Sequence, residues 1–317
     1  MNKTQILGTG SYVPEKILTN QDLAKKMETT DEWIISRTGI KERRVLEEDK
    51  SCSDMAYEAS VRALKDAKIS ALDLDMIIVA TLTADQRCPG ASFLLQDKLG
   101  AKRAAVYDIA VACSGFIFGL SVADQFIKTG YCNRILVVGA EVMTRVVDWT
   151  DRGSCILFGD GAGAVILQAS EKPGLLATHI HADGQYTDLL FAENALYSGK
   201  AKNYIQMQGN EVFRVAVTKL GEIVDQTLTK AGIDKHDIDW FIPHQANMRI
   251  ILAMAKKLDM SMEKVVLTIE EHGNTSAASI PLALDYAVRN NKIKRGDKLL
   301  LEAFGAGFAW GSALVVY

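Results

Sequence analysis

The chain has 317 residues, of which 48% are hydrophobic and 24% charged, with a formal net charge of −3. This composition is typical of a globular protein with one or two domains, and the acidic balance argues against a nucleic-acid partner. No run approaches the roughly 20 apolar residues of a membrane span, and the first residues lack a signal peptide's apolar core. We therefore expect a cytoplasmic protein. Five cysteines without paired spacing and five histidines without a His-x-x-x-His pair favour reduced thiols and argue against a metal site.

The first clear pattern along the chain, at 64–79, occurs twice. It consists of an amphipathic helix, a short polar link and a strand, and it aligns without gaps on 228–243 at an offset of 164 residues. The same offset relates the strand-like segment 134–137 to 298–301, and the glycine-rich segment 158–167 is similar to 304–316. Three matches in the same order indicate an internal duplication.

The duplication predicts the fold class and the domain organisation. Helices alternate with aliphatic strands, a pattern that favours βαβ units and a largely parallel, buried sheet in each half. We expect an α/β protein with an N-terminal half at 1–170, which carries a nucleophilic cysteine, and a C-terminal half at 171–317, which carries a histidine and an asparagine.

A candidate nucleophile lies at the end of a predicted strand. The apolar stretch 104–111 ends just before Cys113, and Ser114-Gly115 opens a helical pattern. Unpaired N–H groups and the macrodipole favour negative charge at a helix N-terminus, so we expect a lowered thiol pKa there. A free cysteine is more often a small buried hydrophobe. We expect no catalytic role for the other four cysteines, which are Cys52, Cys88, Cys132 and Cys155.

Two residues of the second half complete a candidate site. His244 follows the strand of the second repeat, and Asn274 follows a strand predicted at 264–270. Ligands of open α/β sheets bind beyond the carboxyl ends of strands, and a pseudo-twofold arrangement can bring these turns and Cys113 to one cleft. The alternatives are a hydrogen-bonded core histidine and an asparagine that caps a helix. A Cys-His-Asn set is what a thioester-handling enzyme needs.

Eight motifs carry a resemblance to a known family. They are GTGSY (8–12), TDEWI (30–34) with RTGI (37–40), ACSGF (112–116), DRG (151–153), FGDGAG (158–163), PHQAN (243–247), HGNTSAAS (272–279) and FGAGF (304–308). The chain resembles the β-ketoacyl-acyl carrier protein synthase III family of the thiolase superfamily over nearly its whole length. The resemblance implies a five-layered αβαβα fold of two duplicated halves, a homodimer, and the initiating condensation of type II fatty-acid synthesis. In that reaction an acyl-CoA and malonyl-acyl carrier protein give 3-oxoacyl-acyl carrier protein, CoA and CO₂.

The resemblance also implies catalytic roles. Cys113 takes the acyl group as a thioester, while His244 and Asn274 donate hydrogen bonds to the enolate that forms when the malonyl group loses CO₂. Backbone N–H groups of Cys113 and Ala306 form an oxyanion hole, and Phe304 lines the site. Some relatives have glycine where this chain has Ala306, but its N–H is retained.

Substrate contacts follow from the same resemblance. Binding of CoA is assigned to Trp33, Arg37, Arg152, Gly209, Phe213 and Asn247, with the CoA thioester as a substrate and no permanently bound cofactor. Docking of the acidic carrier protein is assigned to Arg214, Gln245, Arg249, Lys256 and Lys257. A packed core aromatic and solvated surface charges are the alternatives for these residues.

One departure from the family concerns the acyl pocket. Acetyl-preferring members often have a bulky aromatic residue where this chain has Cys88, and the smaller side chain predicts tolerance of primers longer than acetyl. Two other functions stay open. One is a relative that condenses other acyl-CoA substrates for a specialised metabolite. The other is a thiolase-fold subunit without chemistry of its own, which would not need the Cys-His-Asn set.

Overall fold

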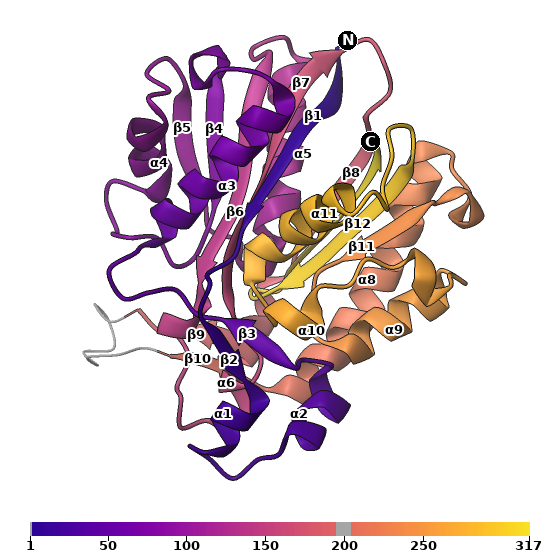
Figure 1. Cartoon of the computed structure of the whole chain (residues 1–317). Helices are drawn as coiled ribbons and strands as arrows, with labels where there is room; N and C mark the ends of the chain where they lie inside the picture. Colours follow the sequence, from indigo (N-terminus) through magenta and orange to yellow (C-terminus); the bar gives the residue numbers. More distant parts are fainter. Residues whose placement is uncertain (1, 195–203) are drawn as a thin grey trace.

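The computed structural model describes residues 2–194 and 204–317. Two sheets lie side by side, with the N-terminal half in indigo to pink and the C-terminal half in orange to yellow (Figure 1). The first sheet has the strand order β1-β7-β6-β4-β5. Its strands are β1 (Lys3–Tyr12), β4 (Met76–Ala80), β5 (Ala105–Ile109), β6 (Arg134–Val142) and β7 (Asp160–Ser170).

The second sheet repeats this order with one strand fewer. Its strands are β8 (Leu175–Ala182), β11 (Trp240–Pro243), β12 (Lys298–Gly305) and β13 (Ala309–Val316), in the order β11-β12-β13-β8. The duplication predicted from the sequence is confirmed in detail. Helix α5 (Gly115–Lys128) and helix α11 (Ser279–Arg289) begin 164 residues apart, and so do two turns that each start with a positive φ, +45° at Ala112 and +49° at Ser276.

The elements form five layers, as expected. Helices α3 (Cys52–Ala67) and α4 (Ala91–Leu99) bury one face of the first sheet. Helices α5 and α11 fill the space between the sheets, and α8 (Gly209–Ala231) with α9 (Met248–Lys257) covers the far face of the second sheet. The arrangement αβαβα is that of the thiolase-like fold.

Short elements close one end of the layers, at the bottom of Figure 1. They are β2 (Ile17–Thr19), α1 (Asn20–Ala24), α2 (Asp31–Thr38), β3 (Glu42–Arg44), α6 (Arg152–Cys155), β9 (Leu190–Ala192), β10 (Ile205–Met207) and α10 (Ile269–His272). Strands β2 and β3 pair with each other, and so do β9 and β10. No helix in the described part of the chain is long and apolar enough to cross a membrane.

The two halves meet with backbone against backbone. A Cβ on Gly139 of β6 would lie 2.2 Å from the carbonyl oxygen of Ala277, and a Cβ on Gly163 of β7 would lie 2.6 Å from the nitrogen of Leu282. Both distances are shorter than any real carbon contact, so only glycine allows this approach. The turn before α11 is thereby held directly over the first sheet.

The expectation of largely parallel sheets was wrong. Strand β4 is parallel to β5 and β6, but β7 is antiparallel to both β6 and β1, and β13 is antiparallel to both β12 and β8. A parallel neighbour requires a crossover connection of a dozen or more residues. The link from β12 to β13 spans only residues 306–308, which permits only an antiparallel pair.

The strand predicted at 264–270 does not form. Only Val265 makes an isolated bridge, to Phe241, and α10 begins at Ile269. The side chain of Gln245 replaces the missing strand partner. Its amide donates to the carbonyl of Val266 at 3.2 Å and accepts from the N–H groups of Thr268 and Ile269 at 3.0 and 3.2 Å.

Candidate active site

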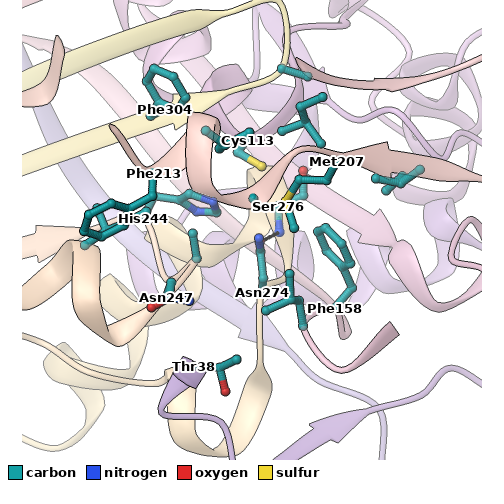
Figure 2. Close-up of a pocket in the computed structure, with 18 of the residues that line it drawn as sticks. Thr38, Cys113, Phe158, Met207, Phe213, His244, Asn247, Asn274, Ser276 and Phe304 are labelled. Atoms are coloured by element: carbon teal, nitrogen blue, oxygen red, sulfur yellow. Dashed lines mark hydrogen bonds between the residues drawn. The ribbon is translucent and has the colours of Figure 1, made fainter. Parts of the chain in front are cut away.

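A cavity of about 670 Å³ reaches the carboxyl ends of the central strands and contains residues from both halves. Cys113, His244 and Asn274 all line it, and in Figure 2 their functional groups point into the same space. Trp33, Arg37, Gly209, Phe213, Asn247, Phe304 and Ala306 also line this cavity. Seven substrate or support residues that are far apart in the sequence therefore surround the three candidate catalytic side chains.

Cys113 sits in a constrained turn before α5. The preceding Ala112 has a φ of +45°, which is uncommon for a residue with a side chain, and this conformation places Cys113 at the start of the helix. The end of β12 packs closely against the turn, because a Cβ on Gly305 would lie 2.9 Å from the nitrogen of Cys113. That contact places the end of β12, which leads into Ala306, against the backbone of the Cys113 turn.

The expected lowering of the Cys113 pKa is wrong. The surrounding protein excludes bulk water, and this burial raises the pKa of the thiol to about 12, although contact with the Ser276 hydroxyl opposes the rise. The charge of Glu141 adds to the increase. Cys113 is therefore a protonated thiol at neutral pH, and its attack on a thioester requires a base.

A buried carboxyl group supports the turn that carries Ser276. Glu141 accepts hydrogen bonds from Thr81 Oγ1 at 3.2 Å, Leu82 N at 3.1 Å and Thr83 Oγ1 at 2.6 Å, and Ser276 Oγ donates to it at 3.0 Å. Burial raises the pKa of Glu141 to about 7 in spite of these bonds. The contact ties the first half directly to the turn of the second half that faces Cys113.

His244 is positioned by its backbone and by one serine. Its N–H donates to the carbonyl oxygen of Glu302 at 2.8 Å, which extends the pairing of β11 with β12. Its Nδ1 lies 2.6 Å from Ser279 Oγ, which accepts from the N–H of Gln245 at 3.3 Å and can either donate to Nδ1 or accept from it. Burial lowers the pKa of His244 to about 3. The ring is neutral. With its hydrogen on Nε2 it is a donor to the cavity, and with its hydrogen on Nδ1, donated to Ser279, its Nε2 can accept a proton.

The amide of Asn274 is oriented by the adjacent turn. Its Oδ1 accepts from the N–H of Ser276 at 2.9 Å, so the NH₂ group is directed into the cavity. The backbone of Asn274 is held as well, because its N–H donates to Leu157 O at 2.8 Å and its carbonyl accepts from Gly159 N at 3.1 Å. These bonds cross between the halves. The site thus offers two N–H donors, from His244 and Asn274, on one side of the sulfur.

An aromatic cluster forms the apolar wall of the cavity. The ring of Phe304 lies 4.6 Å from that of Phe308 and 6.4 Å from that of Trp310, between centroids. Met207 of β10 and Phe158 face the same space (Figure 2). An apolar wall beside two uncharged donors destabilises a carboxylate more than the neutral CO₂ that it releases.

The outer part of the cavity carries positive charge beside aromatic rings. The guanidinium carbons of Arg37 and Arg152 lie 4.7 and 4.6 Å from the ring centroid of Trp33, and that of Arg249 lies 5.0 Å from Phe213. Stacked guanidinium groups suit a ligand that has both a planar base and phosphates. Arg152 is exposed and contacts Trp33, although it does not line the cavity itself.

The residues assigned to carrier docking fall into two groups. Arg214, Arg249, Lys256 and Lys257 are exposed. Arg214 pairs with Glu211 at 2.7 Å, and Lys257 pairs with Asp225 at 2.8 Å. Gln245 cannot belong to this surface, because it is fully buried and its side chain bonds the backbone at 243 and 266–269. We therefore withdraw Gln245 from the docking surface.

Asn247 lines the cavity, whereas Cys88 does not. Both ends of the Asn247 amide are engaged, with Arg37 O at 3.1 Å and Arg249 N at 2.9 Å, where Asn247 caps α9. Cys88 is exposed on the loop between β4 and α4 and does not line the cavity of this chain.

Sequence reasoning missed several residues of the site. Glu302 interrupts the apolar strand 299–304, and an acidic residue in such a strand is a signal that we did not use. Ser279 and Ser276 belong to the motif at 272–279, but only their contacts reveal what they hold. Met207 and the residues of β9 carry no sequence signal, because short strands that pair locally have no distinctive pattern.

A thiolase-like fold with Cys, His and Asn around one cavity defines an acyltransferase of the condensing class. Models of the 3-oxoacyl-[acyl-carrier-protein] synthase III family match residues 107–184, and those of its C-terminal part match 228–317. The chain belongs to this family. Beta-ketoacyl-[acyl-carrier-protein] synthase III of Alkalilimnicola ehrlichii is 55% identical over 323 residues, with all of both chains covered.

Solved structures give the same result. That of 3-oxoacyl-[acyl-carrier-protein] synthase III from Aquifex aeolicus is 48% identical, with a TM-score of 0.95, and 99% of this chain and 100% of that chain are covered. A priming β-ketosynthase from the R1128 polyketide pathway is 35% identical, also with a TM-score of 0.95, over 99% of this chain and 96% of that chain. Members of the family catalyse the condensation that starts fatty-acid synthesis.

Proposed function

We propose that the chain condenses an acyl-CoA primer with malonyl-acyl carrier protein through an acyl-Cys113 intermediate, and that it needs no permanently bound cofactor. The observation that carries this proposal is the shared cavity, in which one thiol faces two oriented N–H donors and whose outer part presents arginines beside aromatic rings. The thiol suits the acyl group of a thioester, the N–H donors suit its oxygen, and the arginines beside aromatic rings suit the base and phosphates of CoA.

In the first step Cys113 attacks the primer thioester. Since the thiol is protonated and the His244 ring is neutral, the proton passes from sulfur to Nε2 of the tautomer that carries its hydrogen on Nδ1, as the C–S bond forms. The N–H groups of Cys113 and Ala306 stabilise the oxyanion, and CoA leaves after it regains the proton. The acyl group remains on Cys113 as a thioester.

In the second step the malonyl group loses CO₂. The resulting enolate oxygen accepts hydrogen bonds from Asn274 and from the Nε2–H tautomer of His244, and both side chains are held in place before the substrate arrives. The enolate carbon attacks the acyl group, the new C–C bond forms, and the C–S bond to Cys113 breaks. Phe304 and its aromatic neighbours keep water away from the carbanion.

The primer pocket is proposed to lie against a partner subunit in a cytoplasmic homodimer. Leu82, which lines the cavity, and Phe93 are about half exposed and flank the loop that carries Cys88. Exposed apolar side chains grouped around one loop favour an interface. In such a dimer the Cys88 loop of each subunit reaches the partner's acyl pocket, and its small side chain leaves room for longer primers.

A mixture of acyl-CoA substrates tests the proposal. The protein is incubated with equal concentrations of acetyl-, butyryl-, hexanoyl- and octanoyl-CoA and digested, and the peptide with Cys113 is analysed by mass spectrometry. We expect one acyl group on Cys113, with chains longer than acetyl transferred at least as well as acetyl. Absence of any adduct would refute the proposed function, and an adduct of acetyl alone would refute only the deeper pocket.

Charge reversal tests the docking surface, here Arg214, Arg249, Lys256 and Lys257. Arg249→Glu is expected to raise the KM for malonyl-carrier about tenfold, because a like charge then faces an acidic partner. The change in kcat should be small, and the effect should shrink at high salt. Lys172→Glu is the matched control, since Lys172 follows the end of β7 that lies away from the cavity. An unchanged KM in Arg249→Glu contradicts the docking surface.

The second enzyme function differs only in substrate. The structural likeness to a priming β-ketosynthase of a polyketide pathway favours it, since the same Cys-His-Asn chemistry serves other primers. Steady-state rates with malonyl groups on fatty-acid and polyketide carriers separate the two. The idea of a subunit without chemistry has no support in a site whose donors are all oriented.

A further inference from the structure

Glu302 is a buried acid whose carboxyl group has no hydrogen-bond partner. It lies on β12, it is 1% exposed, and it lines the cavity that contains Cys113 and His244. Neither Oε1 nor Oε2 has a partner within hydrogen-bonding distance in the described residues. Buried polar groups are nearly always bonded, so an unbonded carboxyl group beside a reacting sulfur requires an explanation.

A row of polar residues leads from Glu302 to the edge of the sheet. Glu302 pairs with Ser312 of β13, and Ser312 pairs with His179 of the edge strand β8. Paired residues of neighbouring strands share a face, so the three side chains form one line across the sheet. Ser312 Oγ is buried and also lacks a partner, while His179 is half-buried and its Nδ1 lies 3.0 Å from Thr227 Oγ1.

Most of the rest of this face is apolar. Alternate residues of a strand point to the same side, and Leu300, Phe304, Trp310 and Leu314 belong to one hydrophobic cluster with α8. A second histidine of β8, His181, also lies on this face and pairs with Trp310. Glu302, Ser312 and His179 thus form a polar line across a largely apolar surface. Since Ser312 Oγ makes no direct hydrogen bond to Glu302 or His179, a proton passes between these groups through intervening water molecules.

The chemistry of the proposed reaction requires a proton in its second step. Transfer of the acyl group from CoA to Cys113 moves a proton from one thiol to the other, and none is consumed. In the condensation the malonyl carboxylate leaves as CO₂, its electron pair forms the C–C bond, and the pair of the broken C–S bond returns to Cys113. The thiolate must then take up one proton before the next cycle.

The groups around the cavity differ in their ability to supply this proton. Burial raises the pKa of Cys113 to about 12, so the thiolate takes up a proton readily, whereas burial lowers the pKa of His244 to about 3, so its ring holds no extra proton. Burial raises the pKa of Glu302 to about 8, which leaves it protonated at pH 7. Glu141 has a similar pKa, but both of its oxygens are engaged by hydrogen bonds.

Few titratable groups face Glu302 from the elements packed against it. Charged neighbours do not contribute to the rise in its pKa, which comes from burial alone. These groups are Cys113 from the turn before α5, His244 after β11, His179 and His181 on β8, and Lys219 on α8, which pairs with Glu222. None of them is a carboxylate that could share a proton with Glu302.

We propose that Glu302 stores the proton that condensation consumes, delivers it through the cavity to Cys113, and is reloaded from solvent along Ser312 and His179. The inference rests on the proposed function, because only a decarboxylating condensation consumes a proton. Glu302 is in this sense a proton-supplying residue and is not expected to bind either substrate.

The two half-reactions are measured separately in Glu302→Gln. Acylation of Cys113 from acetyl-CoA, followed by rapid-quench mass spectrometry, should stay within about threefold of the unmodified protein, because this step needs no added proton. Single-turnover condensation of pre-acylated protein with malonyl-carrier should be at least about tenfold slower at pH 7. In the unmodified protein this rate should fall above about pH 8, and Glu302→Gln should lack that fall.

Glu141→Gln is the matched control, since it removes another buried carboxyl group next to the cavity. It should retain the fall of the condensation rate above about pH 8. Ser312→Ala tests the path: its first turnover should be normal, its steady-state rate lower, and small buffer acids should restore that rate. Infrared difference spectra should show a protonated carboxylic acid that titrates near pH 8, is lost in Glu302→Gln and is retained in Glu141→Gln.

The possible failures can be told apart. If Cys113 of the unmodified protein is not acylated, the proposed function fails before Glu302 is tested. If condensation proceeds and Glu302→Gln keeps both its rate and the fall near pH 8, or if the infrared band that titrates near pH 8 survives in Glu302→Gln, Glu302 does not store the proton. If Glu302→Gln misfolds, the infrared titration of Glu141→Gln decides, because that variant lacks the other buried acid. Absence of a band that titrates near pH 8 in Glu141→Gln overturns the inference.

Discussion

Replacement of Cys113 with alanine is expected to reduce condensation by about 10⁴-fold or more, while decarboxylation of malonyl-carrier stays measurable. The nucleophile divides the reaction into two steps, and without it no acyl-enzyme forms. The donors that stabilise the enolate belong to other residues, and their hydrogen bonds to Ser279 and Ser276 do not involve the sulfur. Release of CO₂ and formation of 3-oxoacyl-carrier are measured in parallel.

Cys132→Ala is the matched control for this experiment. Cys132 is a buried free cysteine in the loop after α5, and it does not line the cavity. It should retain both activities, with some loss of thermal stability from the removed packing. Condensation by Cys113→Ala at a rate near that of the unmodified protein would show that another group carries the acyl chain.

Substitutions of His244 and Asn274 are expected to affect the two half-reactions differently. Asn274→Ala should reduce decarboxylation by about 10²–10³-fold, the usual cost of one lost donor, and should leave acylation of Cys113 nearly unchanged. His244→Ala should reduce both steps, because the imidazole also accepts the proton of the buried thiol. Release of CO₂ and rapid-quench acylation provide the two readouts.

Asn290→Ala is the control for loss of an asparagine amide. Asn290 lies at the far end of α11, and its side-chain amide donates to the local carbonyl of Tyr286 at 2.8 Å. It should retain both half-reactions. Equal losses of acylation in Asn274→Ala and His244→Ala would remove the separate role that we give to the imidazole.

Much of the architecture could be predicted because the sequence contains two copies of the same pattern. The offset of 164 residues identifies α5 as the equivalent of α11, and β4 as the equivalent of β11, before any coordinates are known. The exception is instructive. The segment 264–270 has the apolar character of a strand, but the side chain of Gln245 bonds its backbone and a short helix starts at Ile269. An apolar pattern does not reveal which polar group will satisfy a backbone.

The electrostatics of the site were harder to predict. A helix N-terminus favours a thiolate, but Cys113 is removed from water and lies near the carboxyl group of Glu141, and these effects dominate. The sequence shows the helix start and does not show the burial. The same holds for Glu302. Its importance depends on its lack of a hydrogen-bond partner, and the sequence does not show which residues of neighbouring strands lie beside it.

The close approach at Gly139 has a consequence for evolution as well as for chemistry. Residues 274–278 can pack this closely on the first sheet because Gly139 of β6 has no Cβ. A methyl group at that position would collide with Ala277. Displacement of this turn by even an ångström would misalign the Asn274 amide, and such errors can cost about a hundredfold in rate. Selection on catalysis therefore acts on a residue that has no functional group and touches no substrate.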